Sequence, residues 1–389
     1  MKLIDVAYKH ALIVLEHCVR PVGFYASGLP GGYEALWARD SMTTCLGASL
    51  VGNPFDKAQG KRFKAAFRQS LITLSKNQSW LGQIPNAVGC YNPDRRSRVT
   101  FNSIDSTLWY LVGHQVYAKA YRNKSLLKKF RTNIEKALLW LSYQDPNEDT
   151  LPVQQPTMDW QDIFPHKYGR TINTQALYYG VLTLFGKRKL AENIKQVVNG
   201  EIKQYLSLYD KKRGYYLPWL WKNHDGHREQ EEWFDTLGNL LAIVTNLATP
   251  RIAKSILHFI EKAKVNRPYP CKTIWPPIKK GDKEWHSYFV ASEAKRPYHY
   301  LNAGIWPFLG GFYIAALVKT KQFAKAKQEL ELLAQANKLG RKMQWGFQEW
   351  LHGKTGKPTG GSSSYQAWSA GMYVFAYECV RNKKVPYFS

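Results

Sequence analysis

The 389-residue sequence has few of the features that would place it among disulfide-rich, zinc-binding or membrane-spanning proteins. Its five cysteines (Cys18, Cys45, Cys90, Cys271 and Cys379) show no CxxC spacing, so neither a disulfide framework nor a zinc site is indicated. It has no run of about 18 apolar residues that could span a bilayer. The N-terminal run lacks the long apolar segment of a signal peptide. We therefore expect a cytoplasmic protein with no metal and no membrane partner.

Sequence motifs for nucleotide, serine-nucleophile and metalloprotease chemistry are also missing. There is no Walker loop, no G-x-G-x-x-G after a strand, no G-x-S-x-G elbow and no HExxH. The segment His224-Asp225-Gly226-His227 is only a weak metal-binding pattern in a hydrophilic loop. Gly360-Gly361-Ser362-Ser363 follows a loop, which predicts a turn and not a phosphate cradle. No cofactor is implied.

Acidic residues are scarce, with 29 Asp and Glu against 55 Lys and Arg, a formal net charge of +26. Such a charge can attract nucleic acid. The cations are scattered, however, and the densest groups, 124–129 and 321–327, fall where a solvated helix face is expected. RNA-recognition, zinc-finger and basic-region patterns are absent. We expect a solvated basic surface and no nucleic-acid partner.

Helical periodicity is what the sequence does show, and strand-like alternation is rare. The pattern predicts about twelve helices. They lie near 3–19, 37–51, 58–77, 103–122, 125–144, 170–185, 187–208, 231–246, 250–265, 301–319, 322–338 and 364–382.

The predicted helices form pairs joined by short linkers at 121–125, 185–190 and 319–323, as in antiparallel helical hairpins. Longer connections at 79–102, 145–169, 209–230, 266–300 and 339–363 carry much of the Trp, Pro, Gly and acid content. Long loops of this kind are usually functional. We expect an all-α fold, a closed (α/α)6 toroid in which residues 1–389 form one catalytic domain.

The aromatic content, with 14 Trp and 24 Tyr, suits a carbohydrate binder as well as a large core. Glycoside hydrolysis needs two carboxyl groups facing one cavity. The first candidate is Asp159, and we expect Trp160 beside it to shield the carboxyl from water. Asp159 could instead form an Asx-turn, and Asp162 in the same loop is a rival for the role.

The second candidate is Glu349, which lies between aromatic residues in a loop that ends in a Gly-rich run. Its alternative role is a surface Glu paired with a nearby Lys. Two more acids lie at predicted helix starts. Asp40 follows Arg39 and would pair with it or with sugar hydroxyls, and Asp105 is equally a first-turn acid favoured by the helix dipole.

Several motifs in order resemble the neutral/alkaline invertases, inverting glycoside hydrolases with an (α/α)6 barrel, and the amylo-α-1,6-glucosidase domain of glycogen debranching enzymes. They span nearly the whole chain. The motifs are Trp37-Ala38-Arg39-Asp40, Gly82 to Asn86 with Asn102 to Trp109, Met158-Asp159 with Gly169 to Tyr179, Tyr298 to Pro307, and Glu349 with Thr355 to Lys357 and Tyr365 to Ser369.

The resemblance implies that Asp159 is the general acid and Glu349 the general base. The arginines that follow the invertase acid are absent after Asp159. Counting back from Gly169 also suits Asp162 as the matching acid. Asn173 stands where the invertases have a Glu. The residues expected to contact the sugar are Arg39, Asp40, Asp105, Trp160, Asp162, Asn173, Gln175, Asn302, Trp306, Gln366 and Trp368.

The sequence thus predicts hydrolysis, with inversion, of a sucrose-type or α-linked glucoside. Two alternatives stay open: a debranching-type α-1,6-glucosidase, and a carbohydrate-binding protein of the same fold without catalysis. Changes around Asn173, Leu301 and Ala303 fall where substrate is expected, so they bear on which glycoside is cleaved. A small sugar or oligosaccharide is the expected partner.

Overall fold

The computed structural model describes residues 2–52, 56–147, 149–202, 204–205, 207–222 and 227–388. Within these ranges the chain forms thirteen α-helices. They are α1 (Leu3–Cys18), α2 (Ala38–Ala48), α3 (Lys57–Lys76), α4 (Ile104–Ala120), α5 (Ser125–Lys129), α6 (Arg131–Ser142), α7 (Ile172–Leu184), α8 (Arg188–Asn199), α9 (Thr236–Val244), α10 (Pro250–Lys262), α11 (Pro307–Lys319), α12 (Phe323–Lys338) and α13 (Ala367–Asn382).

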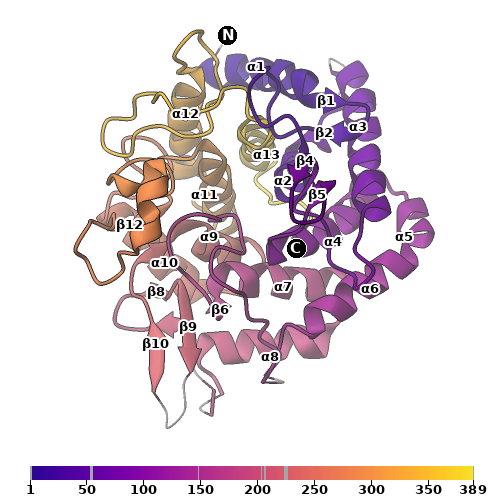
Figure 1. Ribbon diagram of the computed structural model, residues 1–389. Coiled ribbons are helices and arrows are strands. Elements are labelled where there is room, and N and C mark those ends of the chain that lie inside the picture. Colours follow the sequence, from indigo (N-terminus) through magenta and orange to yellow (C-terminus); the bar gives the residue numbers. More distant parts are fainter. Residues whose placement is uncertain are drawn as a thin grey trace.

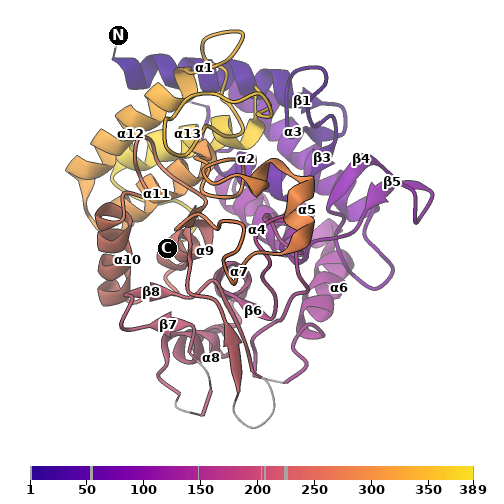
Figure 2. The same ribbon diagram turned by 60° about the vertical axis from the view of Figure 1, so that its left-hand side comes forward.

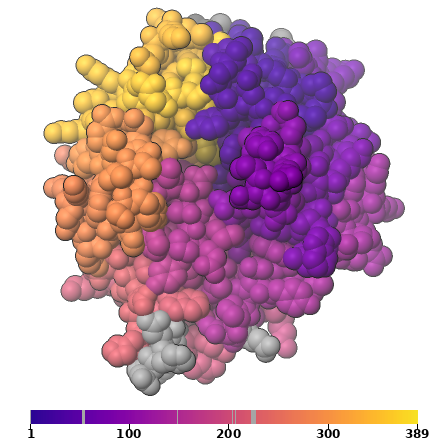
Figure 3. Space-filling model, viewed as in Figure 1, coloured from indigo at the N-terminus to yellow at the C-terminus, as the bar shows by residue number. Residues whose placement is uncertain are grey.

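Six of these helices form a closed inner ring (Figure 1). Each packs on the next in the order α2, α4, α7, α9, α11, α13, and α13 returns to pack on α2. The others lie outside: α3 on α2, α5 and α6 on α4, α8 on α7, α10 on α9, and α12 on α11, with α1 against α12 and α13. This is the expected all-α (α/α)6 toroid. Figure 3 shows the yellow C-terminal part meeting the indigo N-terminal part where the ring closes.

The burial of each helix follows its place in the toroid. Every residue of α2 and α9 is buried, because an inner helix has neighbours on all sides. Outer helices bury one stripe at helical spacing, and in α10 that stripe is Ile252, Ala253, Ile256, Leu257 and Ile260. Inner helices approach closely at glycines: a Cβ on Gly47 of α2 would lie 1.8 Å from the Gly371 carbonyl oxygen of α13.

The strands are short and lie in the long connections, as the two views of the ribbon show (Figures 1 and 2). They are β1 (Val19–Arg20), β2 (Gly23–Phe24), β3 (Leu36–Trp37), β4 (Ala87–Asn92), β5 (Ser97–Thr100), β6 (Arg170–Thr171), β7 (Tyr209–Asp210), β8 (Tyr215–Tyr216), β9 (Trp219–Lys222), β10 (Arg228–Gln230), β11 (Phe234–Asp235) and β12 (Ile274–Trp275). They pair antiparallel as β1-β2, β3-β4-β5, β6-β9-β10, β7-β8 and β11-β12. Two 3₁₀ turns, Ser287–Ala291 and Glu293–Lys295, lie in the 266–300 connection.

Several predicted helix boundaries were wrong. The helix expected over 231–246 begins only at Thr236, because Phe234 and Asp235 pair with β12. The helix expected over 187–208 ends at Asn199, where Gly200 takes a left-handed conformation (φ 76°). Those expected from 301 and 364 begin at 307 and 367, and the one expected over 125–144 is two helices that meet at Phe130.

The residues before the inner helices are extended and not helical. Strands β3, β6 and β11 run directly into α2, α7 and α9. Asp235 caps α9 by accepting a hydrogen bond from the Gly238 N–H, and Thr171 caps α7 in the same way through the Thr174 N–H. These short strands and caps fix where each of the three inner helices begins.

The residues at the end of the chain lie against the C-terminal ends of the inner helices. The Phe388 carbonyl oxygen accepts hydrogen bonds from Lys319 of α11 and from Asn246, which follows α9. The Tyr387 hydroxyl hydrogen-bonds Ser49, just after α2. In the part of the chain that the structure describes, no helix combines the length and the apolar character needed to cross a membrane.

Candidate active site

A pocket lies at the N-terminal ends of the inner helices α2, α11 and α13, and its empty volume is about 400 Å³ with the open solvent at its mouth included. Aromatic and acidic side chains from loops far apart in sequence line it. The lining residues are Tyr33, Trp37, Arg39, Asp40, Trp160, Asp162, Tyr300, Trp306, Glu349, Gln366 and Trp368. A concave site with an aromatic wall and a few convergent polar groups is typical of small-ligand binding.

Tryptophan rings form one wall of the pocket. Trp306 packs edge-on against Trp160 and Trp368, with ring centroids 5.7 Å and 5.5 Å apart. Four uncharged N–H donors in the lining have no acceptor among the described residues: the indoles of Trp37, Trp160 and Trp368 and the side-chain amide of Gln366.

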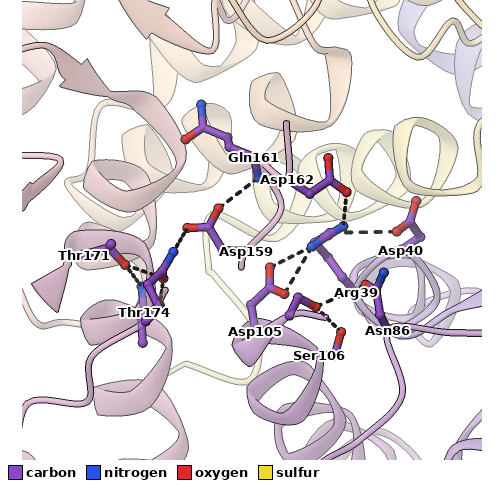
Figure 4. A network of polar contacts seen from close by, with 12 residues as sticks. Arg39, Asp40, Asn86, Asp105, Ser106, Asp159, Gln161, Asp162, Thr171 and Thr174 are labelled. Atoms are coloured by element: carbon purple, nitrogen blue, oxygen red, sulfur yellow. Dashed lines mark hydrogen bonds and ion pairs between the residues drawn. The ribbon is translucent and has the colours of Figure 1, made fainter. Parts of the chain in front are cut away.

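Arg39 is the centre of the acidic side of the pocket (Figure 4). Its Nη1 lies 3.1 Å from both carboxylate oxygens of Asp105, which is fully buried at the start of α4. Its Nη2 lies 3.8 Å from Asp162 Oδ2, and its Nε lies 3.9 Å from Asp40 Oδ2. Asp105 therefore holds the guanidinium so that it faces two pocket carboxylates.

Glu349 lies across the same pocket, held by residues from both ends of the chain. Its Oε1 accepts a hydrogen bond from the Tyr33 hydroxyl at 3.0 Å, and its Oε2 accepts one from the Ser363 N–H at 3.4 Å. Its own N–H donates to the Ser363 carbonyl at 2.8 Å. The Gly360 to Ser363 segment is thus a turn that holds Glu349, as expected. Glu349 itself is buried and is not the surface Glu of the alternative interpretation.

The pocket lining contains more carboxyl groups than cations. Burial raises the pKa of Glu349 to about 8 and that of Asp40 to about 7. Burial also raises the pKa of Asp162 to about 6, although Arg39 opposes that rise. Asp40 and Asp162 share one guanidinium, which Asp105 already engages, whereas Glu349 is held by the neutral donors Tyr33 and Ser363.

Asp159 lies outside the pocket. Its side chain is fully buried, is absent from the pocket lining and points away from Arg39 (Figure 4). Its Oδ2 lies 2.9 Å from the ammonium of Lys167, and its Oδ1 accepts the Gln161 N–H at 2.9 Å. The second contact is the Asx-turn of the alternative interpretation. The expectation that Asp159 faces the cavity was therefore wrong, and the rival Asp162 lines the pocket instead.

Four of the residues expected to contact the sugar are placed elsewhere. Asp105 lies behind Arg39, and Asn173 is fully buried at the start of α7. Gln175 donates to the Pro152 carbonyl at 2.7 Å. The Asn302 side chain accepts a hydrogen bond from the Ile278 N–H and donates to the carbonyl oxygens of Ile278 and Ala294. The other expected residues, Arg39, Asp40, Trp160, Asp162, Trp306, Gln366 and Trp368, do line the pocket.

Sequence reasoning missed three residues of the lining. Trp37 and Tyr300 stand inside motifs that had been recognised, and their aromatic character was the available signal. Tyr33 stands in a Gly-rich stretch without a motif, and only the fold brings it to Glu349. No group of His, Cys, Asp and Glu among the described residues could hold a metal ion. The weak pattern at His224 to His227 lies mostly outside the described residues, since 224–226 are not among them.

The sequence matches the model of a known family, described as alkaline and neutral invertase, over residues 183–383. The match covers more than half of the 389 residues. The chain belongs to this family. The pocket extends beyond the matched part, because Tyr33, Arg39, Asp40 and Asp162 precede it.

Plant members of the invertase family are among the curated relatives. Probable alkaline/neutral invertase D of Arabidopsis thaliana is 27% identical over 293 residues, which are 75% of this chain and 49% of the relative. Cytosolic invertase 1 of Oryza sativa subsp. japonica is 30% identical over 147 residues, 37% of this chain and 25% of the relative. The chain thus spans half or less of the length of these relatives.

Solved structures with similar folds include glycosidases. A structure titled "Glycosidase Wild Type" aligns with a TM-score of 0.66 and 15% identity, covering 97% of both chains. The GH63 mannosylglycerate hydrolase from Thermus thermophilus, in complex with Tris and D-glycerate, aligns with a TM-score of 0.65 and 13% identity, over 95% of this chain and 99% of the other. At such identities the likeness establishes the fold, the (α/α)6 barrel, over nearly the whole chain.

Proposed function

We propose that this invertase-family chain hydrolyses the glycosidic bond of a small, uncharged glycoside with inversion, and that residues 1–389 act as one catalytic domain. The observation that carries the proposal is that Asp162 and Glu349 line one pocket together with a tryptophan wall. Two carboxyl groups and a water molecule suffice for this reaction. No cofactor is needed.

Asp162 is assigned as the general acid and Glu349 as the general base. Asp162 is the pocket acid in the loop before α7, and its spacing to Gly169 suits the invertase acid. The hydrogen bonds that Glu349 accepts from Tyr33 and Ser363 favour its carboxylate form, which a base requires, but burial outweighs them and raises the pKa of Glu349 to about 8.

In the reaction, Asp162 gives its proton to the glycosidic oxygen as the bond from C1 to that oxygen breaks. Glu349 takes a proton from water, and the resulting hydroxide oxygen bonds to C1 from the opposite face. The product sugar has the inverted anomeric configuration. Exchange with solvent then returns a proton to Asp162 and removes one from Glu349.

The substrate is an α-linked glucoside or a sucrose-type sugar. Among the described residues that line the pocket, Arg39 is the only cation, and three carboxyl groups surround it, so an anionic substrate would be repelled. Release of reducing sugar from sucrose, maltose, isomaltose, trehalose and glucosylglycerate, measured side by side, identifies the substrate. Detection of the first-formed anomer by NMR tests inversion.

The carboxyl roles are tested with Asp162→Asn and Glu349→Gln. Each should lower the rate on a sugar leaving group by about two orders of magnitude or more. On α-glucosyl fluoride, whose leaving group needs no proton, Asp162→Asn should stay active while Glu349→Gln should not. Retained activity of both variants on the natural leaving group would refute the assignment. Heat of binding on titration with sugar, with no product formed by the wild type, would instead indicate a carbohydrate-binding protein.

A further inference from the structure

Around the proposed acid, side chains alternate between the pocket and a buried cluster. Trp160 and Asp162 line the pocket, whereas Asp159 and Gln161 are fully buried. Both buried residues bind the same cation, the ammonium of Lys167, which is itself fully buried. The contacts of Asp159 and Gln161 with Lys167 therefore affect how Trp160 and Asp162 are oriented in the pocket.

Lys167 makes three short contacts, which account for all three of its N–H donors. Its Nζ lies 2.9 Å from Asp159 Oδ2, 3.0 Å from Asp235 Oδ2 and 2.6 Å from Gln161 Oε1. The cluster holds two carboxylates and one ammonium inside the protein, so each charge depends on the others for compensation.

The cluster is anchored to two helices of the inner ring. Asp235 caps α9 through the Gly238 N–H at 3.1 Å. Asp159 also accepts a hydrogen bond at 3.2 Å from Gln154, whose side-chain oxygen accepts from the hydroxyls of Thr171 and Thr174 at the start of α7. The loop that carries Asp162 is therefore tied to the N-terminal ends of both α7 and α9.

We propose that Lys167 is a positioning residue, whose ammonium holds the loop 159–162 so that Asp162 faces the scissile bond. The proposal rests on the function proposed above. A buried ion cluster contributes little stability compared with apolar residues of the same volume. What the Lys167 cluster supplies is a fixed geometry, and a displacement of about 1 Å can cost a hundredfold in rate.

The experiment compares Asp159→Asn with Asp235→Asn, because Lys167→Met would leave two buried carboxylates unpaired and could prevent folding. Asp159→Asn removes the ion pair between Lys167 and the acid loop and leaves the Gln161 hydrogen bond to Lys167 in place. Asp235→Asn breaks the tie to α9 but leaves Asp159 and Gln161 bound to Lys167. Because each variant removes one carboxylate from the same ammonium, we expect similar downward shifts of the thermal unfolding midpoint.

The two variants should differ in catalysis. Asp159→Asn should lower kcat on a sugar leaving group by about ten- to a hundredfold with little change in KM. It should leave the rate on α-glucosyl fluoride close to that of the wild type, because that substrate does not use the acid. Asp235→Asn should lose clearly less of its kcat on the sugar leaving group. Equal losses on both substrates in Asp159→Asn, or equal losses in the two variants, would overturn the proposal.

A second measurement separates this proposal from the proposed function. Amide hydrogen exchange over residues 158–168 should become faster in Asp159→Asn and stay close to wild type in Asp235→Asn. If the wild type cleaves no glycoside, the proposed function fails, and the exchange result alone decides whether Lys167 holds the loop. Unchanged exchange in Asp159→Asn would show that it does not.

Discussion

At the scale of single residues, the main result is that Asp162 lines the pocket and Asp159, three positions earlier in the same loop, does not. Asp159 and Asp162 are three positions apart, and both stand beside aromatic or apolar residues. Local sequence does not distinguish them, because the difference lies in what each meets across the fold. Asp159 meets Lys167, and Asp162 meets Arg39 and the pocket.

The pocket carboxyl groups predict the pH dependence of the reaction. The active form of the proposed pair carries one proton, on Asp162. Burial raises the pKa of Asp162 to about 6 and that of Glu349 to about 8, so between these values the form with its proton on Asp162 is the minor one of the two singly protonated forms. Below about pH 6 both carboxyls are protonated and the base is lost. Above about pH 8 both are ionised and the acid is lost. A plot of kcat/KM against pH should therefore be bell-shaped with its maximum at about pH 7.

The profile of Asp162→Asn on α-glucosyl fluoride provides the control. With the acid removed and not needed, the activity should depend on Glu349 alone, rise through its pKa and stay high at alkaline pH. A wild-type profile that is flat from about pH 5 to about pH 9 would contradict the assignment of these two groups.

At the scale of helices, the inner ring depends on glycines at crossing points. Gly47 of α2 and Gly371 of α13 face each other where the ring closes. A Cβ on Gly371 would lie 2.6 Å from the Cα and the carbonyl oxygen of Thr44, closer than packed atoms allow. Helical periodicity cannot reveal such contacts, since they join segments more than 300 positions apart.

Gly371→Ala should therefore destabilise the protein by about 1–3 kcal/mol through overpacking. Unfolding in urea, followed by circular dichroism, measures the change. Gly360→Ala is the matched control, because its Cβ would meet no described atom closer than 3.6 Å and its backbone is not left-handed. Equal stability of the two variants would show that the crossing of α2 and α13 can widen at no cost.

At the scale of the whole molecule, the excess positive charge lies apart from the proposed pocket. Many of the cations stand on the outer helices, for example Lys61, Arg62, Arg188, Lys189 and Lys327, and are exposed. The proposed pocket opens at the N-terminal ends of the inner helices α2, α11 and α13, and Arg39 is the one cation among its described lining residues. The net charge of +26 therefore describes the outer surface and not the pocket.

This separation predicts weak, non-specific binding to polyanions that leaves catalysis unchanged. A fluorescent DNA duplex should bind at low salt and dissociate steeply as salt rises. Saturating duplex should not alter kcat or KM for the sugar, because the small substrate reaches the pocket without crossing the basic helices. Fluorescence anisotropy and the sugar assay measure the two effects. Binding that persists in high salt or competes with sugar would favour a nucleic-acid function.

The sequence alone determined the fold class and the family. Residues that face the core recur at helical spacing because an outer helix has one buried stripe, and long loops rich in Trp and acids predicted where the site would form. Glu349, Arg39, Asp40 and several other expected residues line the pocket because their motifs precede or open helices of the inner ring.

Only the tertiary structure decided which carboxyl groups face each other. Strands of two residues before α2, α7 and α9 are too short to show alternation in sequence, yet they set where each inner helix begins. Tyr33 meets Glu349 across 316 positions, and Asp159 is turned inward by Lys167. These are contacts between distant segments, and their energies depend on burial and charge neighbours that no local pattern contains.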